Sequence, residues 1–189
     1  MFIYTLDDVS NPDKSYVIGD VLFTADQIGQ RVRELGEKIS ADYADECPLV
    51  ITVLRGSVLF AADLVRHIDC PLEMDFLSVS SYGQSTKSSG AVKILKDLDT
   101  DVAGRDVLIV EDIIDSGLTL NYLVNYIAGQ KPASIKTCSL LLRNIDPANE
   151  PPLDYYGFKI PDEFVVGYGL DYAQMYRNLP DISILVEEE

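Results

Sequence analysis

One stretch of thirteen residues, VLIVEDIIDSGLT at positions 107–119, restricts the possible folds of this chain most strongly. Its first four residues form a continuous apolar run, as a buried parallel strand does. Two adjacent carboxylates, Glu111 and Asp112, end this run, and Asp115 follows three residues later. The segment 116–119, Ser-Gly-Leu-Thr, then opens a helix, where backbone N–H groups and the helix dipole favour an anion. The stretch therefore predicts a strand–loop–helix junction that binds phosphate.

The acidic residues make this predicted phosphate site unusual. It has neither the Gly-Lys-Ser/Thr of an NTPase loop nor the G-x-G-x-x-G of a dinucleotide site. Adjacent carboxylates are suited to accept hydrogen bonds from sugar hydroxyls or to bind a hard cation such as Mg²⁺. We therefore predict a ribose 5-phosphate site, with the phosphate at the helix start and the ribose diol on Glu111 and Asp112. The alternative is an ordinary acidic loop in which an Asp or Ser caps the helix.

Helical and extended segments alternate along the chain, which is typical of an α/β fold with a parallel sheet. Thr24 and Gln27 form a capping box that predicts the start of a helix. The Ser- and Gly-rich residues 81–90 predict an exposed loop. Residues 1–189 are expected to form one domain. Strands are expected over 49–54, 72–80, 107–110, 134–142, 164–168 and 182–186, and helices through 59–68 and 120–127.

The composition limits the classes of partner and compartment. The 189 residues include 15 Lys and Arg against 31 Asp and Glu, a formal net charge of −16. A chain this acidic offers no basic face for nucleic acid or an anionic membrane. Three cysteines, Cys47, Cys70 and Cys138, form no C-x-x-C pair, which favours reduced thiols. The N-terminal residues do not resemble a secretory signal, and no apolar run is long enough to span a membrane, so a cytoplasmic protein is expected.

Three aspartates, Asp97, Asp99 and Asp101, alternate with other residues as at the start of a calcium-binding loop. The glycine and the terminal glutamate of such a loop are absent. We therefore expect a solvated loop at this position rather than a metal site.

The stretch 107–119 resembles the phosphoribosyl pyrophosphate (PRPP) motif of the type I phosphoribosyltransferases. Four further segments resemble the hypoxanthine-guanine phosphoribosyltransferases of that family, in order and from about residue 15 onward. They are LRGS at 54–57, SSYGQSTKSSG at 80–90, KDLDTD at 96–101 and FVVGYGLDYAQMYRNLP at 164–180. The resemblance implies a parallel sheet flanked by helices, with a small hood formed by both chain ends.

The same resemblance implies an activity. PRPP would react with hypoxanthine or guanine to give IMP or GMP and pyrophosphate, with Mg²⁺ as cofactor. The leaving pyrophosphate would be neutralised by Mg²⁺ and by arginines. A homodimer or homotetramer is also implied.

The resemblance assigns roles to individual residues. Asp115 is implied as the catalytic general base or acid at the purine N7, and a cis peptide bond is implied between Leu54 and Arg55. The residues implied to bind the ribose and 5′-phosphate of PRPP are Glu111, Asp112, Asp115, Ser116, Gly117, Leu118 and Thr119. Those implied to bind pyrophosphate are Leu54, Arg55, Gly56, Ser81, Tyr82 and Arg177. Those implied to bind the purine are Ile113, Arg143, Phe164, Val165 and Asp171, and those implied to hold Mg²⁺ are Glu111, Asp112 and Asp171.

One position departs from the family pattern. Where the family has a lysine after the strand SLLL, this chain has Arg143, and a planar guanidinium is not equivalent to an ammonium group. A donor at this position fits the 6-oxygen of hypoxanthine, guanine and xanthine but faces the amino group of adenine, so we expect adenine to be rejected. A xanthine-preferring enzyme is one alternative. A PRPP-sensing regulator without catalysis is another, but the net charge and the presence of Asp115 and Asp171 favour an enzyme.

Overall fold

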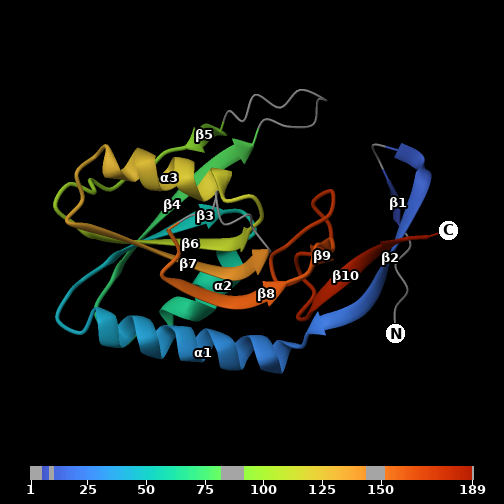
Figure 1. Ribbon diagram of the computed structural model, residues 1–189, viewed down its shortest axis with the longest axis horizontal. Coiled ribbons are helices and arrows are strands. Elements are labelled where there is room, and N and C mark those ends of the chain that lie inside the picture. Colours follow the sequence, from blue (N-terminus) through green and yellow to red (C-terminus); the bar gives the residue numbers. More distant parts are fainter. Residues whose placement is uncertain (1–5, 9–10, 82–91, 144–151, 189) are drawn as a thin grey trace.

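The larger of two sheets has six strands in the order β5-β4-β3-β6-β7-β8 (Figure 1). It belongs to a computed structural model that describes residues 6–8, 11–81, 92–143 and 152–188. Neighbouring strands are parallel, except that β5 pairs antiparallel with β4. The predicted α/β fold with a parallel sheet is therefore confirmed. The strands are β3 (Leu49–Leu54), β4 (Glu73–Ser81), β5 (Val92–Lys96), β6 (Asp106–Ile114), β7 (Ser134–Arg143) and β8 (Tyr155–Ile160).

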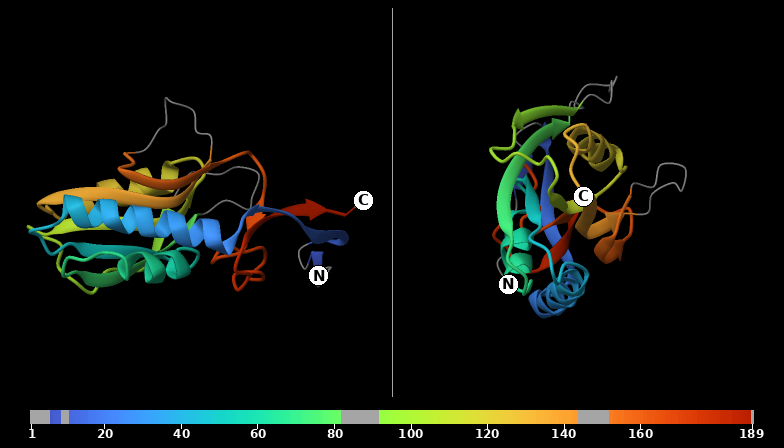
Figure 2. Two further views of the ribbon diagram at one scale, coloured as in Figure 1. Left: turned by 90° about the horizontal axis from the view of Figure 1, so that it is seen from below. Right: turned by 90° about the vertical axis from the view of Figure 1, so that its left-hand side faces the viewer.

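Helices cover both faces of this sheet. Two of them, α1 (Ala25–Asp42) and α2 (Val58–Val65), lie on one face, and α3 (Leu118–Ala128) lies on the other (Figures 1 and 2). Side chains alternate between the faces along β3. Val50 packs with residues of α1 and α2, whereas Ile51 packs with residues of α3. No helix in the described part of the chain is long and apolar enough to cross a membrane.

The first helix begins where the sequence predicts. Thr24 is the N-cap of α1, and its Oγ1 accepts a hydrogen bond of 3.3 Å from the Gln27 N–H. The Thr24 N–H donates in return to Gln27 Oε1 at 2.9 Å. The capping box therefore satisfies N–H groups that the helix itself leaves without partners.

A second, antiparallel sheet forms a hood from both ends of the chain. Its order is β1-β2-β10-β9. The hood lies beyond the carboxyl ends of the parallel strands, which point toward it in Figure 1. The hood implied by the family resemblance is thus present, and it faces the edge of the sheet where α/β proteins bind ligands. Its strands are β1 (Leu6–Asp8), β2 (Asn11–Phe23), β9 (Val165–Val166) and β10 (Ile182–Glu187).

The strand predictions differ from the structure in two ways: one strand is longer than predicted, and several strands were not predicted. The strand predicted over 107–110 continues to Ile114, because β6 stays paired with the apolar end of β7. Glu111 and Asp112 are therefore strand residues and not loop residues. The strands β1, β2, β5 and β8 were not predicted. In β8 the apolar pattern is interrupted by Gly157, where any side chain would meet the backbone of Leu140 in the neighbouring strand.

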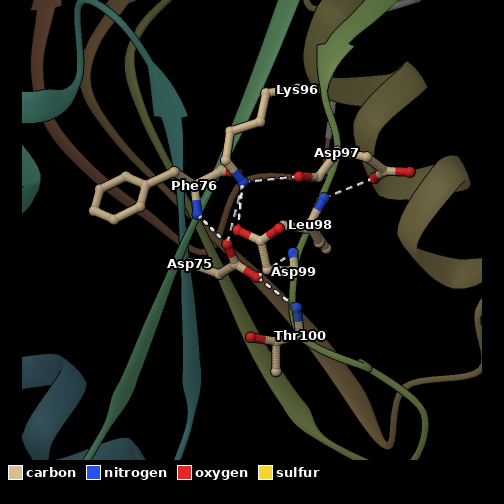
Figure 3. Close-up of polar contacts among 7 residues, drawn as sticks. All are labelled: Asp75, Phe76, Lys96, Asp97, Leu98, Asp99 and Thr100. Atoms are coloured by element: carbon tan, nitrogen blue, oxygen red, sulfur yellow. Dashed lines mark hydrogen bonds and ion pairs between the residues drawn. The ribbon is translucent and has the colours of Figure 1, made fainter.

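The aspartate-rich segment after β5 is bound to the sheet and is not simply solvated. Asp75 of β4 is buried, and its carboxylate accepts hydrogen bonds from the backbone N–H groups of Phe76, Asp99 and Thr100 at 2.6–2.9 Å (Figure 3). The Lys96 ammonium lies 3.7 Å from the same carboxylate. Burial raises the pKa of Asp75, but the N–H donors together have a larger and opposite effect. The pKa of Asp75 therefore lies below its usual range. Asp75 thus fixes residues 97–100 to the edge of the sheet.

The variant Asp75→Asn is expected to lower the free energy of unfolding by about 3 kcal/mol at pH 7, because hydrogen bonds to a charged acceptor are lost. A carboxyl whose pKa is lower in the folded state stabilises the fold above its unfolded pKa of about 3.9. The difference between wild type and variant should therefore shrink as the pH falls from about 5 toward 3. Urea unfolding at several pH values measures it.

The matched control is Asp101→Asn, because Asp101 is exposed and its carboxylate accepts from one backbone N–H, that of Ala103. Its effect should be well under half that of Asp75→Asn. Equal effects of the two variants at pH 7 would contradict the role assigned to Asp75.

Candidate active site

Two neighbouring carboxylates lie near the carboxyl end of β6. Glu111 is buried, and burial together with the charge of Asp112 raises the pKa of Glu111 well above its usual range. Burial also raises the pKa of Asp112, to about 6, although its Oδ1 accepts a hydrogen bond of 3.0 Å from the Ile113 N–H. Ionising both groups therefore costs free energy. A bound cation, or hydroxyl groups that donate to them, would lower that cost.

A cavity of about 380 Å³ opens between these carboxylates and the start of α3. Gly117, the N-cap of α3, has a φ of 75°, a left-handed conformation that favours glycine. The first N–H groups of α3 have no partners within the helix, which suits an anion at this position. Leu118 does not line the cavity, and its side chain is exposed. The lining residues are Glu111, Asp112, Ile113, Ile114, Asp115, Ser116, Gly117, Thr119 and Leu120.

Arg143, at the end of β7, forms an ion pair with Asp115 of this cavity. Its Nε lies 2.7 Å from Asp115 Oδ1, although the N–H does not point along a hydrogen bond to that oxygen. One terminal nitrogen of the guanidinium contacts Asp162 Oδ1 at 3.1 Å and donates to the Glu163 carbonyl at 2.9 Å. The Arg143 side chain is only 16% exposed, whereas that of Asp115 is 70% exposed. The guanidinium is thus held by Asp162 and Glu163, which lie between β8 and β9, and Asp115 is accessible to solvent beside it.

An exposed aromatic ring lies next to the segment that holds Arg143. Phe164 is 50% exposed, and its ring meets Tyr172 edge to face with centroids 5.7 Å apart. Val165, the next residue, lies in β9 and pairs with Ile184 of β10. An aromatic face of this kind can stack on a planar ring.

The loop after β3 approaches Asp112 from another side. The Leu54–Arg55 peptide bond is cis, as the resemblance implies. A side chain at Gly56 would overlap the Asp112 carboxylate, and one at Gly169 would overlap the Gly56 carbonyl. Glycines therefore let the backbone of the loop after β3 approach both the Asp112 carboxylate and the backbone of the loop after β9.

Arg177 lies in the loop between β9 and β10. One terminal nitrogen donates to the Gly169 carbonyl at 2.7 Å, and the other forms an ion pair with Asp171 at 2.7 Å. Its positive charge also lowers the pKa of Asp112, although burial has the larger and opposite effect. The Gln174 Oε1 accepts from Arg177 at 3.1 Å and from Arg55 at 3.2 Å. Two arginines thus meet beside the acidic pair.

Comparison with known proteins agrees with this geometry. Residues 20–173 match the protein-family model for the phosphoribosyl transferase domain. The chain belongs to the phosphoribosyltransferase family. The hypoxanthine-guanine phosphoribosyltransferase of Bacillus subtilis is 55% identical over 168 residues, which cover 89% of this chain and 93% of the relative.

Solved phosphoribosyltransferases have the same fold. The hypoxanthine-guanine phosphoribosyltransferase of Bacillus anthracis, described with HEPES in its active site, superposes with a TM-score of 0.83 at 47% identity. That comparison covers 89% of this chain and 99% of the other. A hypoxanthine-guanine-xanthine phosphoribosyltransferase superposes with a TM-score of 0.81 at 43% identity, covering 89% and 97%.

The acidic residues of this phosphoribosyltransferase fit Mg²⁺ delivered with the substrate. No group of three or more candidate ligand side chains occurs in the described parts of the chain. Mg²⁺ commonly binds one or two carboxylates and completes its shell with waters and substrate oxygens. Burial raises the pKa of both Glu111 and Asp112, so a cation bound beside them would offset the cost of ionising them. Asp171 is already paired with Arg177, so it is the weaker candidate ligand.

The structure brings together most of the residues implied by the family resemblance. Ser81 is the last residue of β4, and Tyr82 lies outside the described residues. The loop predicted over 81–90 also lies outside them, apart from Ser81, which belongs to the strand. Sequence reasoning missed Gln174, Asp162 and Gly169. The two glycines of GYG at 167–169 could have indicated close backbone contact, whereas nothing in the sequence pattern singles out Gln174.

Proposed function

We propose that this protein transfers the phosphoribosyl group of PRPP to hypoxanthine or guanine, giving IMP or GMP and pyrophosphate in purine salvage. The observation that carries the proposal is the cavity that joins the acidic pair of β6 to the start of α3 and is also lined by Asp115, the ion-pair partner of Arg143. The names of the relatives from the two Bacillus species support the same reaction.

The cavity suggests how PRPP would bind. The 5′-phosphate would lie at the start of α3, on the N–H groups of residues 116–119 and the hydroxyls of Ser116 and Thr119. The ribose hydroxyls would donate to Glu111 and Asp112, which would relieve the cost of their burial. The diphosphate would then face the loop of residues 54–56, with Arg55 and Arg177 as donors.

Mg²⁺ would be held by Glu111 and Asp112, with Asp171 as a further candidate, and when bound it would neutralise charge on the diphosphate. The two arginines would stabilise the charge that develops on the leaving oxygen as the C1–oxygen bond breaks. Asp115, exposed at the rim, would accept the N7 proton of the purine as the new bond forms.

The purine subsite would combine Phe164 and Arg143. The exposed Phe164 ring would stack on the base, the backbone of Val165 would contact its edge, and Ile113 would line the cavity beneath it. Arg143 would donate to the purine 6-oxygen. A guanidinium has no acceptor atom for the amino group of adenine, and because Asp162 and the Glu163 carbonyl fix it, it cannot turn away from that group.

Nucleotide formation from PRPP and Mg²⁺ with hypoxanthine, guanine, xanthine and adenine in parallel tests the proposal. Turnover of hypoxanthine or guanine is expected, with kcat/KM for adenine lower by at least about 10⁴-fold, because adenine would leave a buried donor without an acceptor. PRPP binding without turnover of any base would favour a PRPP-sensing regulator. Equal turnover of adenine would contradict the role of Arg143.

The same assay tests a second candidate, a preference for xanthine. Arg143 favours this candidate because a guanidinium carries more donors than the ammonium of the usual lysine, and xanthine carries more carbonyl oxygens than hypoxanthine. One relative of known structure is named for all three bases. A kcat/KM for xanthine above that for hypoxanthine and guanine would favour this reading.

We also place the enzyme in the cytoplasm as a single-domain protein that forms homodimers or homotetramers. All three of its cysteines are free, with Cys70 and Cys138 buried, as in a reducing compartment. Sedimentation of the purified protein would determine the number of subunits.

A further inference from the structure

One neutral oxygen joins two cationic side chains at the diphosphate end of the site. The side-chain carbonyl of Gln174 accepts a hydrogen bond of 3.2 Å from Arg55 and one of 3.1 Å from Arg177. Arg55 comes from the loop after β3, and Arg177 comes from the loop between β9 and β10, more than one hundred residues later. Two like charges that meet at one atom repel each other, so an acceptor between them lowers the cost of bringing them together.

The two arginines depend on Gln174 to different degrees. Arg177 is also held by the Gly169 carbonyl at 2.7 Å and by Asp171 at 2.7 Å. Arg55 is exposed, and among the described residues Gln174 is the one partner to which its guanidinium donates a hydrogen bond. Gln174 therefore matters most for the position of Arg55.

The position of Gln174 is itself fixed by the loop. Its backbone N–H donates to Asp171 Oδ2 at 2.8 Å, and its φ is 71°. A residue in this left-handed conformation projects its side chain in a different direction from a residue with a negative φ. Asp171 thus orients both Gln174 and Arg177.

We propose that Gln174 is a positioning residue that holds Arg55 and Arg177 together, ready to bind a diphosphate. The inference rests on the proposed function and names a residue for the pyrophosphate end of that site. An amide is suited to this role because it accepts hydrogen bonds from both arginines without cancelling their charge, whereas a carboxylate would neutralise part of it and repel the ligand. The gain is preorganisation, since an arginine that is already ordered loses less entropy on binding.

The variant Gln174→Asn separates this role from a purely structural one. Asparagine tolerates a left-handed φ and keeps the amide, but its side chain is one methylene shorter and cannot span the same two contacts. We expect its affinity for magnesium pyrophosphate, measured by calorimetry, to fall by about 3- to 10-fold, the effect of having to order one further long side chain. KM for PRPP should rise similarly, while KM for the purine and kcat stay within about twofold and the melting temperature stays that of the wild type.

A second variant, Gln174→Glu, tests the need for a neutral acceptor. It keeps the length of the side chain and adds a negative charge beside the bound diphosphate, so pyrophosphate affinity should fall by about tenfold or more at low salt. The matched control is Gln30→Asn, because Gln30 lies on α1 and donates to Glu34. This control should bind pyrophosphate as the wild type does.

The possible results separate the two proposals. If the wild type forms nucleotide and Gln174→Asn binds pyrophosphate as tightly as the wild type, Gln174 has no positioning role. Equal or tighter binding by Gln174→Glu would likewise overturn the inference. A change in KM for the purine as large as that for PRPP would indicate a distorted loop and overturn it too. If the wild type forms no nucleotide with any base, the proposed function itself fails.

Discussion

Replacing Asp115 by asparagine is expected to lower kcat by about 10²- to 10⁴-fold, the usual contribution of a general acid or base. Affinity for PRPP should change by less than about threefold, because an amide keeps the shape of the side chain and Asp115 lies at the rim of the cavity. The Asp115 side chain is 70% exposed beside Arg143, so it can reach a purine there. Steady-state kinetics together with direct PRPP binding measures both quantities.

The ion pair with Arg143 supplies the control for this variant. Asp162 is the other carboxylate that contacts the same guanidinium, at 3.1 Å, and its side chain is 96% exposed. Asp162→Asn should therefore lower kcat by less than about tenfold, since it weakens the hold on Arg143 without removing a proton acceptor. Equal losses of kcat and PRPP affinity in Asp115→Asn would show that Asp115 binds substrate and does not transfer a proton.

Local signals in the sequence predicted the parts of the fold that depend on neighbours in the chain. The capping box of Thr24 and Gln27 and the apolar run 49–54 occur as predicted. The end of β6 did not follow the local pattern. Acidic residues usually end a buried strand, but Glu111 and Asp112 continue one because β7 pairs with β6 up to Ile114. That pairing also accounts for the burial that raises the pKa values of the two carboxyls.

The candidate site was predicted in its acidic half and missed where it depends on contacts between distant loops. The carboxylates and the helix start are contiguous in sequence, so their chemistry could be recognised there. The partners of Arg143 and Arg55 come from the segments 162–163 and 174, and no local pattern relates these positions. Such contacts form only when the hood folds over the carboxyl edge of the parallel sheet.

The Gly56→Ala variant should lose about 10²-fold or more in kcat/KM for PRPP. A methyl group at this position would overlap the Asp112 carboxylate, which must then rotate away from the cavity. Displacement of a binding group by about 1 Å commonly costs this much. The fold should survive, because a side-chain rotation relieves the overlap. Kinetics and thermal unfolding of the same preparation test both parts of the expectation.

Two comparisons isolate the contact between Gly56 and Asp112. Gly29→Ala is the matched control, because Gly29 lies in α1 and a Cβ added there would meet no other atom within 4 Å. Alanine at this position should stabilise the helix by about 1 kcal/mol and leave activity unchanged. In an Asp112→Ala background, Gly56→Ala should cause little further loss, because the group that it displaces is already absent. Full additivity of the two losses would contradict the contact and would place the effect of Gly56 in the loop itself.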